Sequence, residues 1–153
     1  MRLGEMPIGA VVVANGEVVA EAHTGERTQR RLMVHAELLA LDAADQVLGS
    51  NRGSASLFAT LEPCIMCLGA AFTARIGRVV YALESPSDGG CAAFRWWDAN
   101  RAPGSMSTYA MPDLCPGVLR RDSAELFRRF AERSPKGWAQ DWATGLARLG
   151  EQR

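Results

Sequence analysis

The chain has no excess of charge of either sign and no long apolar run. Its 153 residues include 17 Lys and Arg and 17 Asp and Glu, which gives a formal net charge of zero. A dedicated nucleic-acid-binding domain usually has a basic excess, and a membrane-spanning helix needs roughly 20 apolar residues in sequence. The N-terminus also lacks the charged and then apolar regions of a secretory signal. We therefore expect a single domain over residues 1–153, cytoplasmic and without membrane contact.

Cysteine and histidine are scarce. The chain has only four cysteines and two histidines, which are Cys64, Cys67, Cys91, Cys115, His23 and His35. A cytoplasmic chain of this length does not need disulfides to fold, so metal binding or catalysis is the favoured use of its cysteines.

The hydrophobic pattern predicts alternating strands and helices. Asn15-Gly16 suits a two-residue turn between two strands rich in valine. Residues 23–33 are polar and are interpreted as a loop. The arginines within 120–133 alternate with apolar residues, which indicates a solvated helix face. Strands are predicted over 8–14, 17–22, 55–62 and 78–84, helices over 34–49, 63–77, 91–100, 121–133 and 134–149, and one short edge strand within 102–117. This order predicts an α/β fold with helices on the faces of a mixed sheet.

The segment LEPCIMC at residues 61–67 carries the first chemical signal. Pro63 suits the first position of a helix, where one N–H is unpaired anyway. Cys64 and Cys67 then lie one turn apart on the same face, where the helix N-terminus stabilises thiolates. That geometry suits two bonds to Zn²⁺. The spacing alone also fits a redox pair or two small residues of a core.

His35 and Glu37 extend this signal. One imidazole and two thiolates make three protein ligands, and the fourth position stays open for water, as in catalytic zinc sites. A carboxylate such as that of Glu37 beside this water can take its proton and deliver it elsewhere. Three alternatives stay open: Glu37 as a surface residue, His35 as a helix-capping or core residue, and Cys91 or Cys115 as a further zinc ligand.

The two segments HAE at 35–37 and PCIMC at 63–67 form the H-x-E…P-C-x-x-C signature of zinc deaminases. The sequence resembles the cytidine deaminase superfamily, and within it the branch of tRNA adenosine deaminases and guanine deaminases. The stretches that carry the likeness lie between residues 5 and 85: MPIGAVVV, VHAELLAL, TLEPCIMCLGA and ARIGRVVYAL. The resemblance implies a three-layer α/β/α fold with a mixed five-stranded sheet.

The resemblance also implies the residues of the site. His35, Cys64 and Cys67 are expected to bind Zn²⁺, and Glu37 is expected to be the catalytic acid and base. Four residues are expected to contact the substrate: Thr24, Ala36, Glu62 and Ser85. A homodimer with active sites near the subunit contact is expected as well.

The sequence departs from this branch at positions that concern the substrate. Thr24 stands where tRNA adenosine deaminases usually have an asparagine that contacts the base, and RRLMVHAE replaces D-P-T-A-H-A-E. Ser85 stands where an aspartate usually contacts the sugar, with Asp88 close by. The family also usually has a helix before the first strand. Here the first strand is expected about seven residues in, so either that helix is missing or the start of the sequence is misassigned.

A cluster of aromatic residues follows the resembling part: Phe94, Trp96, Trp97 and Tyr109. These rings could stack on a base. The alternative is that they fill the core or a dimer contact.

The expected function is zinc-dependent hydrolysis of an exocyclic amine to a carbonyl, with release of ammonia. Neutral charge and the departures at Thr24 and Ser85 favour a small substrate, which is a free base, a nucleoside or a related heterocycle. The first alternative is deamination of adenosine to inosine in tRNA. The second is a non-catalytic module with a structural zinc site, which requires four protein ligands. A thiol redox protein would leave His35 and Glu37 without a role.

Overall fold

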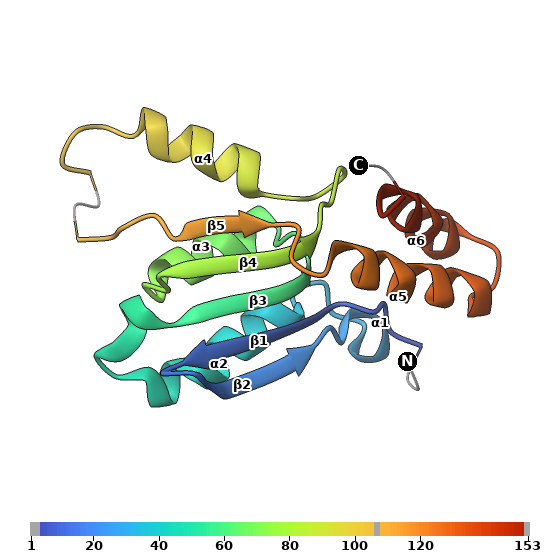
Figure 1. Cartoon of the computed structure of the whole chain (residues 1–153), viewed down its shortest axis with the longest axis horizontal. Helices are drawn as coiled ribbons and strands as arrows, with labels where there is room; N and C mark the ends of the chain where they lie inside the picture. Colours follow the sequence, from blue (N-terminus) through green and yellow to red (C-terminus); the bar gives the residue numbers. More distant parts are fainter. Residues whose placement is uncertain (1–3, 106–107, 152–153) are drawn as a thin grey trace.

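A five-stranded sheet with strand order β2-β1-β3-β4-β5 forms the centre of the computed structural model, which describes residues 4–105 and 108–151 (Figure 1). The strands are β1 (Gly9–Ala14), β2 (Glu17–His23), β3 (Ser56–Leu61), β4 (Arg78–Leu83) and β5 (Asp113–Pro116). β1 is antiparallel to both of its neighbours, whereas β3, β4 and β5 run parallel. The predicted α/β/α fold with a mixed five-stranded sheet is therefore confirmed. Residues 106 and 107 of the predicted irregular segment lie outside the described residues.

The first two strands form the predicted hairpin. Asn15 and Gly16 at its turn have φ angles of 54° and 82°. Both angles lie in the left-handed region, which glycine and asparagine adopt most easily. Val12 faces the core and Val11 faces the opposite side of the sheet, and the register of β1 against β2 shifts between Val12 and Val13.

In the described part of the chain, six helices surround the sheet: α1 (Glu26–Gln29), α2 (Ala36–Leu48), α3 (Ile65–Thr73), α4 (Cys91–Asn100), α5 (Arg120–Arg133) and α6 (Trp138–Leu149). A 3₁₀ turn, η1 (Asn51–Ser54), precedes β3. The prediction that α3 begins at Pro63 is wrong. Cys64 has an extended backbone (φ −68°, ψ 170°) and is the residue before the helix, so Cys67 alone lies in the first turn.

The polar segment 23–33 contains a short helix, α1, rather than a loop throughout. The residue before this helix is Gly25, which has no side chain to cap the free N–H groups. The buried carboxylate of Glu5 replaces that cap. It accepts hydrogen bonds from the backbone N–H of Arg27 at 3.3 Å and of Thr28 at 2.6 Å. A residue distant in the sequence therefore holds α1 in place.

Two apolar clusters hold the layers together. In the larger one, α2 and α3 pack against one face of the sheet, with Val12, Leu57 and Leu68 fully buried. In the smaller one, Phe127 of α5 and Leu146 of α6 pack with Leu83 at the end of β4. The second cluster therefore fixes α6, the last helix, beside the C-terminal ends of the parallel strands. Among the described residues, no helix is long and apolar enough to cross a membrane.

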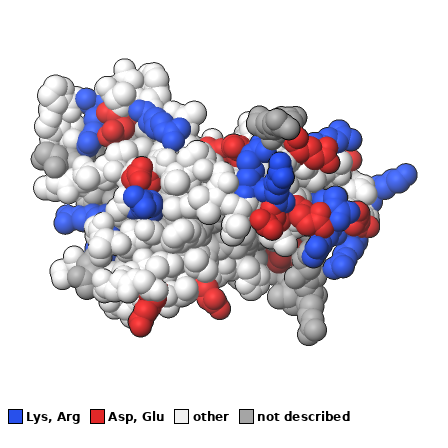
Figure 2. Space-filling view, in the orientation of Figure 1, with Lys and Arg blue, Asp and Glu red and all other residues white. Residues whose placement is uncertain are grey.

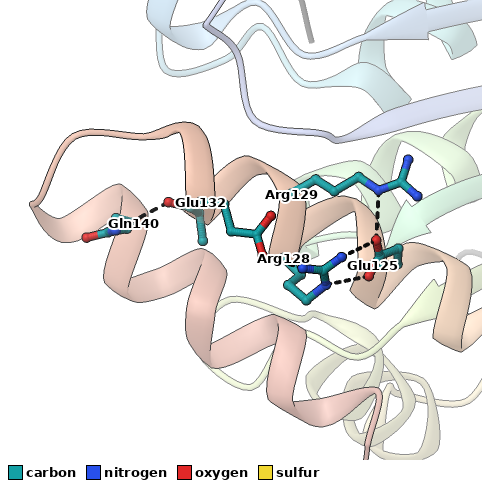
Figure 3. Close-up of polar contacts among 6 residues, drawn as sticks. Glu125, Arg128, Arg129, Glu132 and Gln140 are labelled. Carbon is teal, nitrogen blue, oxygen red and sulfur yellow. Dashed lines mark hydrogen bonds and ion pairs between the residues drawn. The ribbon is translucent and has the colours of Figure 1, made fainter.

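The outward face of α5 carries charges of both signs. Arg128 and Arg129 pair with Glu125 at 2.6 Å and 2.7 Å, one helical turn away (Figure 3). In Figure 2, blue and red side chains are mixed over the α5 and α6 end of the molecule. These arginines form a solvated, ion-paired helix face, as their alternation with apolar residues predicts.

Candidate active site

His35, Cys64 and Cys67 meet at the N-terminal ends of two helices. The Cys64 and Cys67 sulfurs are 3.5 Å apart, and His35 Nδ1 lies 3.7 Å from Cys64 Sγ and 3.5 Å from Cys67 Sγ. His35 directly precedes α2, and Cys64 directly precedes α3. Within residues 4–105 and 108–151, this is the only group of three or more potential metal ligands with ligand atoms within 4.8 Å of one another. Cys91 and Cys115 do not belong to it, so the structure gives this group three protein ligands rather than four.

The three side chains influence each other's protonation. The hydrogen bond with Cys67, followed by that with His35, lowers the pKa of Cys64 to about 4. The hydrogen bond with Cys64 raises the pKa of Cys67, and burial raises it further. These contacts favour the thiolate of Cys64, which is the form that binds a metal.

Glu37 lies beside this group in the first turn of α2. Its side chain is only 3% exposed, and burial raises its pKa. One carboxylate oxygen, Oε2, is buried without a hydrogen-bond partner. Such an oxygen is unfavourable in a protein interior unless a partner is supplied, and water held at a metal is one such partner. The three ligands and this free oxygen together fit a zinc ion that binds water.

A cavity of about 220 Å³ opens onto this group. Four carboxylates line it, and none of the lysines and arginines that the structure describes does. The lining residues are Met6, Ile8, Thr24, Glu26, His35, Glu37, Leu61, Glu62, Cys64, Asp88, Trp138 and Trp142. A wider hollow of about 700 Å³ lies over the opposite sheet face, between the first four strands and α5, and contains none of the three ligands. The smaller cavity is therefore the candidate active site.

Residues 2–83 match the family described as the cytidine and deoxycytidylate deaminase zinc-binding region. The chain belongs to this deaminase family. The family prediction is therefore confirmed, and with it zinc as the cofactor and zinc-dependent deaminases as the enzyme class.

Two curated proteins are similar in sequence to more than half of this deaminase-family chain. A tRNA-specific adenosine deaminase of Bacillus subtilis is 48% identical over 90 residues, which are 58% of this chain and 55% of that protein. The chain thus matches about half the length of that relative. A tRNA-specific adenosine deaminase of Agrobacterium fabrum is 35% identical over 127 residues, which are 82% of this chain and 80% of that protein.

Two solved structures are also similar to this chain. A tRNA:A34 deaminase, which edits A to I at the wobble position of transfer RNA, is 35% identical with a TM-score of 0.64, over 80% of this chain and 86% of that one. A guanine deaminase from Nitrosomonas europaea is 22% identical with a TM-score of 0.59, over 81% of this chain and 72% of that one. The second likeness concerns the fold alone.

The structure brings two of the four predicted substrate-contact residues of this deaminase domain to the cavity. Thr24 lines it, and its hydroxyl donates to the carbonyl of Val34 at 3.0 Å. Glu62 also lines it, and its carboxylate accepts the backbone N–H of Ser85 at 3.1 Å and of Cys91 at 3.0 Å.

The other two predicted substrate-contact residues do not line the cavity. The Ala36 side chain is fully buried in the larger apolar cluster. Ser85 is buried, and its hydroxyl donates to Asp88 at 2.6 Å. Asp88 itself lines the cavity, so the hydrogen bond to Asp88 connects Ser85 to the site.

The aromatic cluster that the sequence shows at residues 94–109 does not line the cavity. Phe94, Trp97 and Tyr109 instead surround Phe72 of α3, with ring centroids 5.2 to 5.7 Å from it. The interpretation as core residues is therefore confirmed for these three, and Trp96 is 70% exposed elsewhere on α4. The aromatic side chains at the cavity come from α6, and the sequence did not reveal them. Trp138 and Trp142 are four residues apart, a spacing that places both on one helix face.

Glu26 of α1 is a further residue of the site that the sequence did not reveal. Its Oε1 lies 3.5 Å from Nε2 of His35, while Nδ1 of the same ring faces the two cysteines. A histidine that binds a metal through one nitrogen usually donates its other N–H to a carboxylate or carbonyl, which fixes the ring and makes it a better ligand. Glu26 is in position to do this for His35.

Replacing Glu26 by alanine is expected to weaken zinc binding by about 10- to 100-fold, because His35 loses the carboxylate that orients it. Competition with a chromophoric zinc chelator measures this affinity directly. Glu26→Gln keeps an acceptor oxygen and should lose less. Glu17→Ala, on the exposed start of β2, is the control and should leave the affinity unchanged. Equal affinity in Glu26→Ala and Glu17→Ala would show that Glu26 does not support the ligand.

Proposed function

We propose that this chain is a zinc-dependent deaminase that converts adenosine in a transfer RNA to inosine. The observation that carries the proposal is the similarity to a tRNA-specific adenosine deaminase over 82% of the chain. From the sequence alone, a small substrate is the first expectation and tRNA is the alternative. This similarity favours tRNA. His35, Cys64 and Cys67 are proposed as the zinc ligands, and Glu37 as the residue that transfers protons.

The geometry of the site supports hydrolysis of a C–N bond. Zinc bound by the three ligands would lower the pKa of a water molecule toward neutrality. Glu37 takes a proton from the water as its oxygen bonds to the ring carbon, and passes that proton to the ring nitrogen. Glu37 then takes the remaining proton from the added hydroxyl group and delivers it to the amine, which leaves as ammonia when the C–N bond breaks and the carbonyl forms. A buried carboxylate with a raised pKa and a free oxygen is suited to both tasks.

A free nucleobase or nucleoside is the second candidate substrate, and the charge of the cavity favours it. Glu26, Glu62 and Asp88 line the cavity together with Glu37, and no lysine or arginine of the described part of the chain does. Carboxylates at this position repel a phosphate group. Thr24 also replaces the asparagine that the resemblance leads one to expect at the base. A small neutral heterocycle would meet no such repulsion.

An assay with both substrate classes distinguishes the two candidates. The zinc-loaded protein is incubated with an anticodon stem-loop RNA that has adenosine at the wobble position, and separately with free bases and nucleosides, adenosine among them. We expect inosine in the RNA, with kcat/KM at least about 10-fold above that for free adenosine, because RNA offers additional contacts.

The outcome of this assay assigns the substrate. Ammonia from a free base or nucleoside, without inosine in the stem-loop, would exclude the tRNA proposal and support the second candidate. Absence of ammonia from every substrate, with zinc bound, would exclude both. The homodimer and the cytoplasmic location stay predictions.

A further inference from the structure

Helix α6 brings two tryptophans to the mouth of the active-site cavity. Trp138 and Trp142 both line it, one helical turn apart. Trp142 is anchored, because its ring meets Phe127 edge to face at 5.7 Å and its Nε1–H donates to Ser87 Oγ at 3.2 Å. Trp138 is different, because 70% of it is exposed to solvent. The cavity therefore has a large, open aromatic face at its rim.

The helix that carries Trp138 is firmly attached. Ala143 and Leu146 on its inner side are buried against α5. Gln140, two residues after Trp138, donates from Nε2 to the carbonyl of Ala131 at the end of α5, at 3.3 Å (Figure 3). The position of the Trp138 backbone is therefore set by contacts outside the cavity. A ligand that stacks on Trp138 would not have to order this helix first.

The charge at the rim limits how a substrate can be held there. Glu26 and Asp88 line the cavity, and among residues 4–105 and 108–151 no lysine or arginine does. Recognition of a phosphate group at this rim is unfavourable for that reason. A planar base can instead gain affinity from contact with an aromatic face, and such stacking does not depend on the identity of the base.

We propose that Trp138 is a stacking platform for a planar base at the mouth of the cavity. This inference rests on the proposed function only in taking a nucleobase as the ligand. The stacked ring is either the base that is deaminated or its neighbour in an RNA chain. The two sources have the same chemistry, and substrates with and without a neighbouring base distinguish them.

The chain offers a matched control for the test. Trp96 on α4 is also 70% exposed but does not line the cavity. Trp138→Ala, Trp138→Phe and Trp96→Ala are compared with the unchanged protein, all zinc-loaded, with adenosine and with the anticodon stem-loop as probes. Ammonia release gives KM and kcat, and the quenching of tryptophan fluorescence by the same two probes reports binding without turnover.

We expect Trp138→Ala to raise KM by about 10-fold, with little change in kcat, because the indole stacks on a ring without touching the reacting atoms. Trp138→Phe should recover most of the affinity, and Trp96→Ala should leave KM unchanged. A rise in KM with both probes assigns the stacked ring to the target base. A rise with the stem-loop alone assigns it to a neighbouring base.

An unchanged KM in Trp138→Ala, in a protein that turns over either probe, would overturn the proposal and leave the proposed function intact. If neither probe releases ammonia, the proposed function fails. Fluorescence quenching then tests separately whether Trp138 stacks on a base. Because Trp142 also lines the cavity, quenching that is weaker in Trp138→Ala than in the unchanged protein supports the platform. Equal or absent quenching in both proteins overturns it. Thermal unfolding of both alanine variants confirms that the fold is retained.

Discussion

Replacing Glu37 by glutamine is expected to lower kcat by roughly 10²- to 10⁴-fold while zinc stays bound. Glutamine has nearly the same shape as glutamate but cannot accept and return a proton at neutral pH. Glu37 is not one of the three clustered ligands, so the metal does not depend on it. The measurement combines ammonia release with metal analysis of the same purified sample.

The zinc content of Glu37→Gln shows whether Glu37 transfers protons or helps to bind the metal. Near-normal turnover with zinc retained would exclude Glu37 as the proton carrier. Loss of zinc together with activity would instead make it part of the metal site. Glu17→Gln, a change of the same kind on an exposed strand end, controls for the removal of one negative charge. It should alter neither the zinc content nor kcat.

The parts of this protein that the sequence predicts are those with strong local signals. Asn15-Gly16 between two valine-rich stretches predicts the first hairpin, and the apolar run at residues 78–84 predicts β4. The pair His35 and Glu37, together with Cys64 and Cys67, predicts a metal site because these residue types have few other reasons to occur at that spacing. In the structure the ligand atoms of the two cysteines and the histidine lie within 4.8 Å of one another.

The parts that the sequence does not predict depend on contacts between distant segments. The short helix α1 is capped by Glu5, which lies 22 and 23 residues before its two partners. No pattern within residues 23–33 reveals such a cap. Glu26 reaches His35 only because α1 is held at the cavity. Trp138 lies far along the chain from the metal ligands, and the packing of α6 on α5 brings it to the site.

Replacing Cys67 by serine is expected to remove zinc. The activity should then fall by at least about 10³-fold, because the Lewis acid that activates water is lost. The Cys67 side chain is fully buried, and its sulfur lies 3.5 Å from both Cys64 Sγ and His35 Nδ1. A serine hydroxyl is a far poorer ligand for zinc than a thiolate. Metal analysis and ammonia release are measured on the same samples. Cys115→Ser is the control, because Cys115 is a half-buried cysteine of β5 outside the cluster.

Burial of Cys67 requires that loss of metal be separated from loss of fold. The unchanged protein stripped of zinc by a chelator supplies the reference. If serine removes only a ligand, Cys67→Ser and the stripped protein should unfold at similar temperatures, and added zinc should restore activity only to the stripped protein. Full zinc content in Cys67→Ser would exclude Cys67 as a ligand. Unchanged activity in the stripped protein would exclude zinc from the reaction and would return the two cysteines to a redox or packing role.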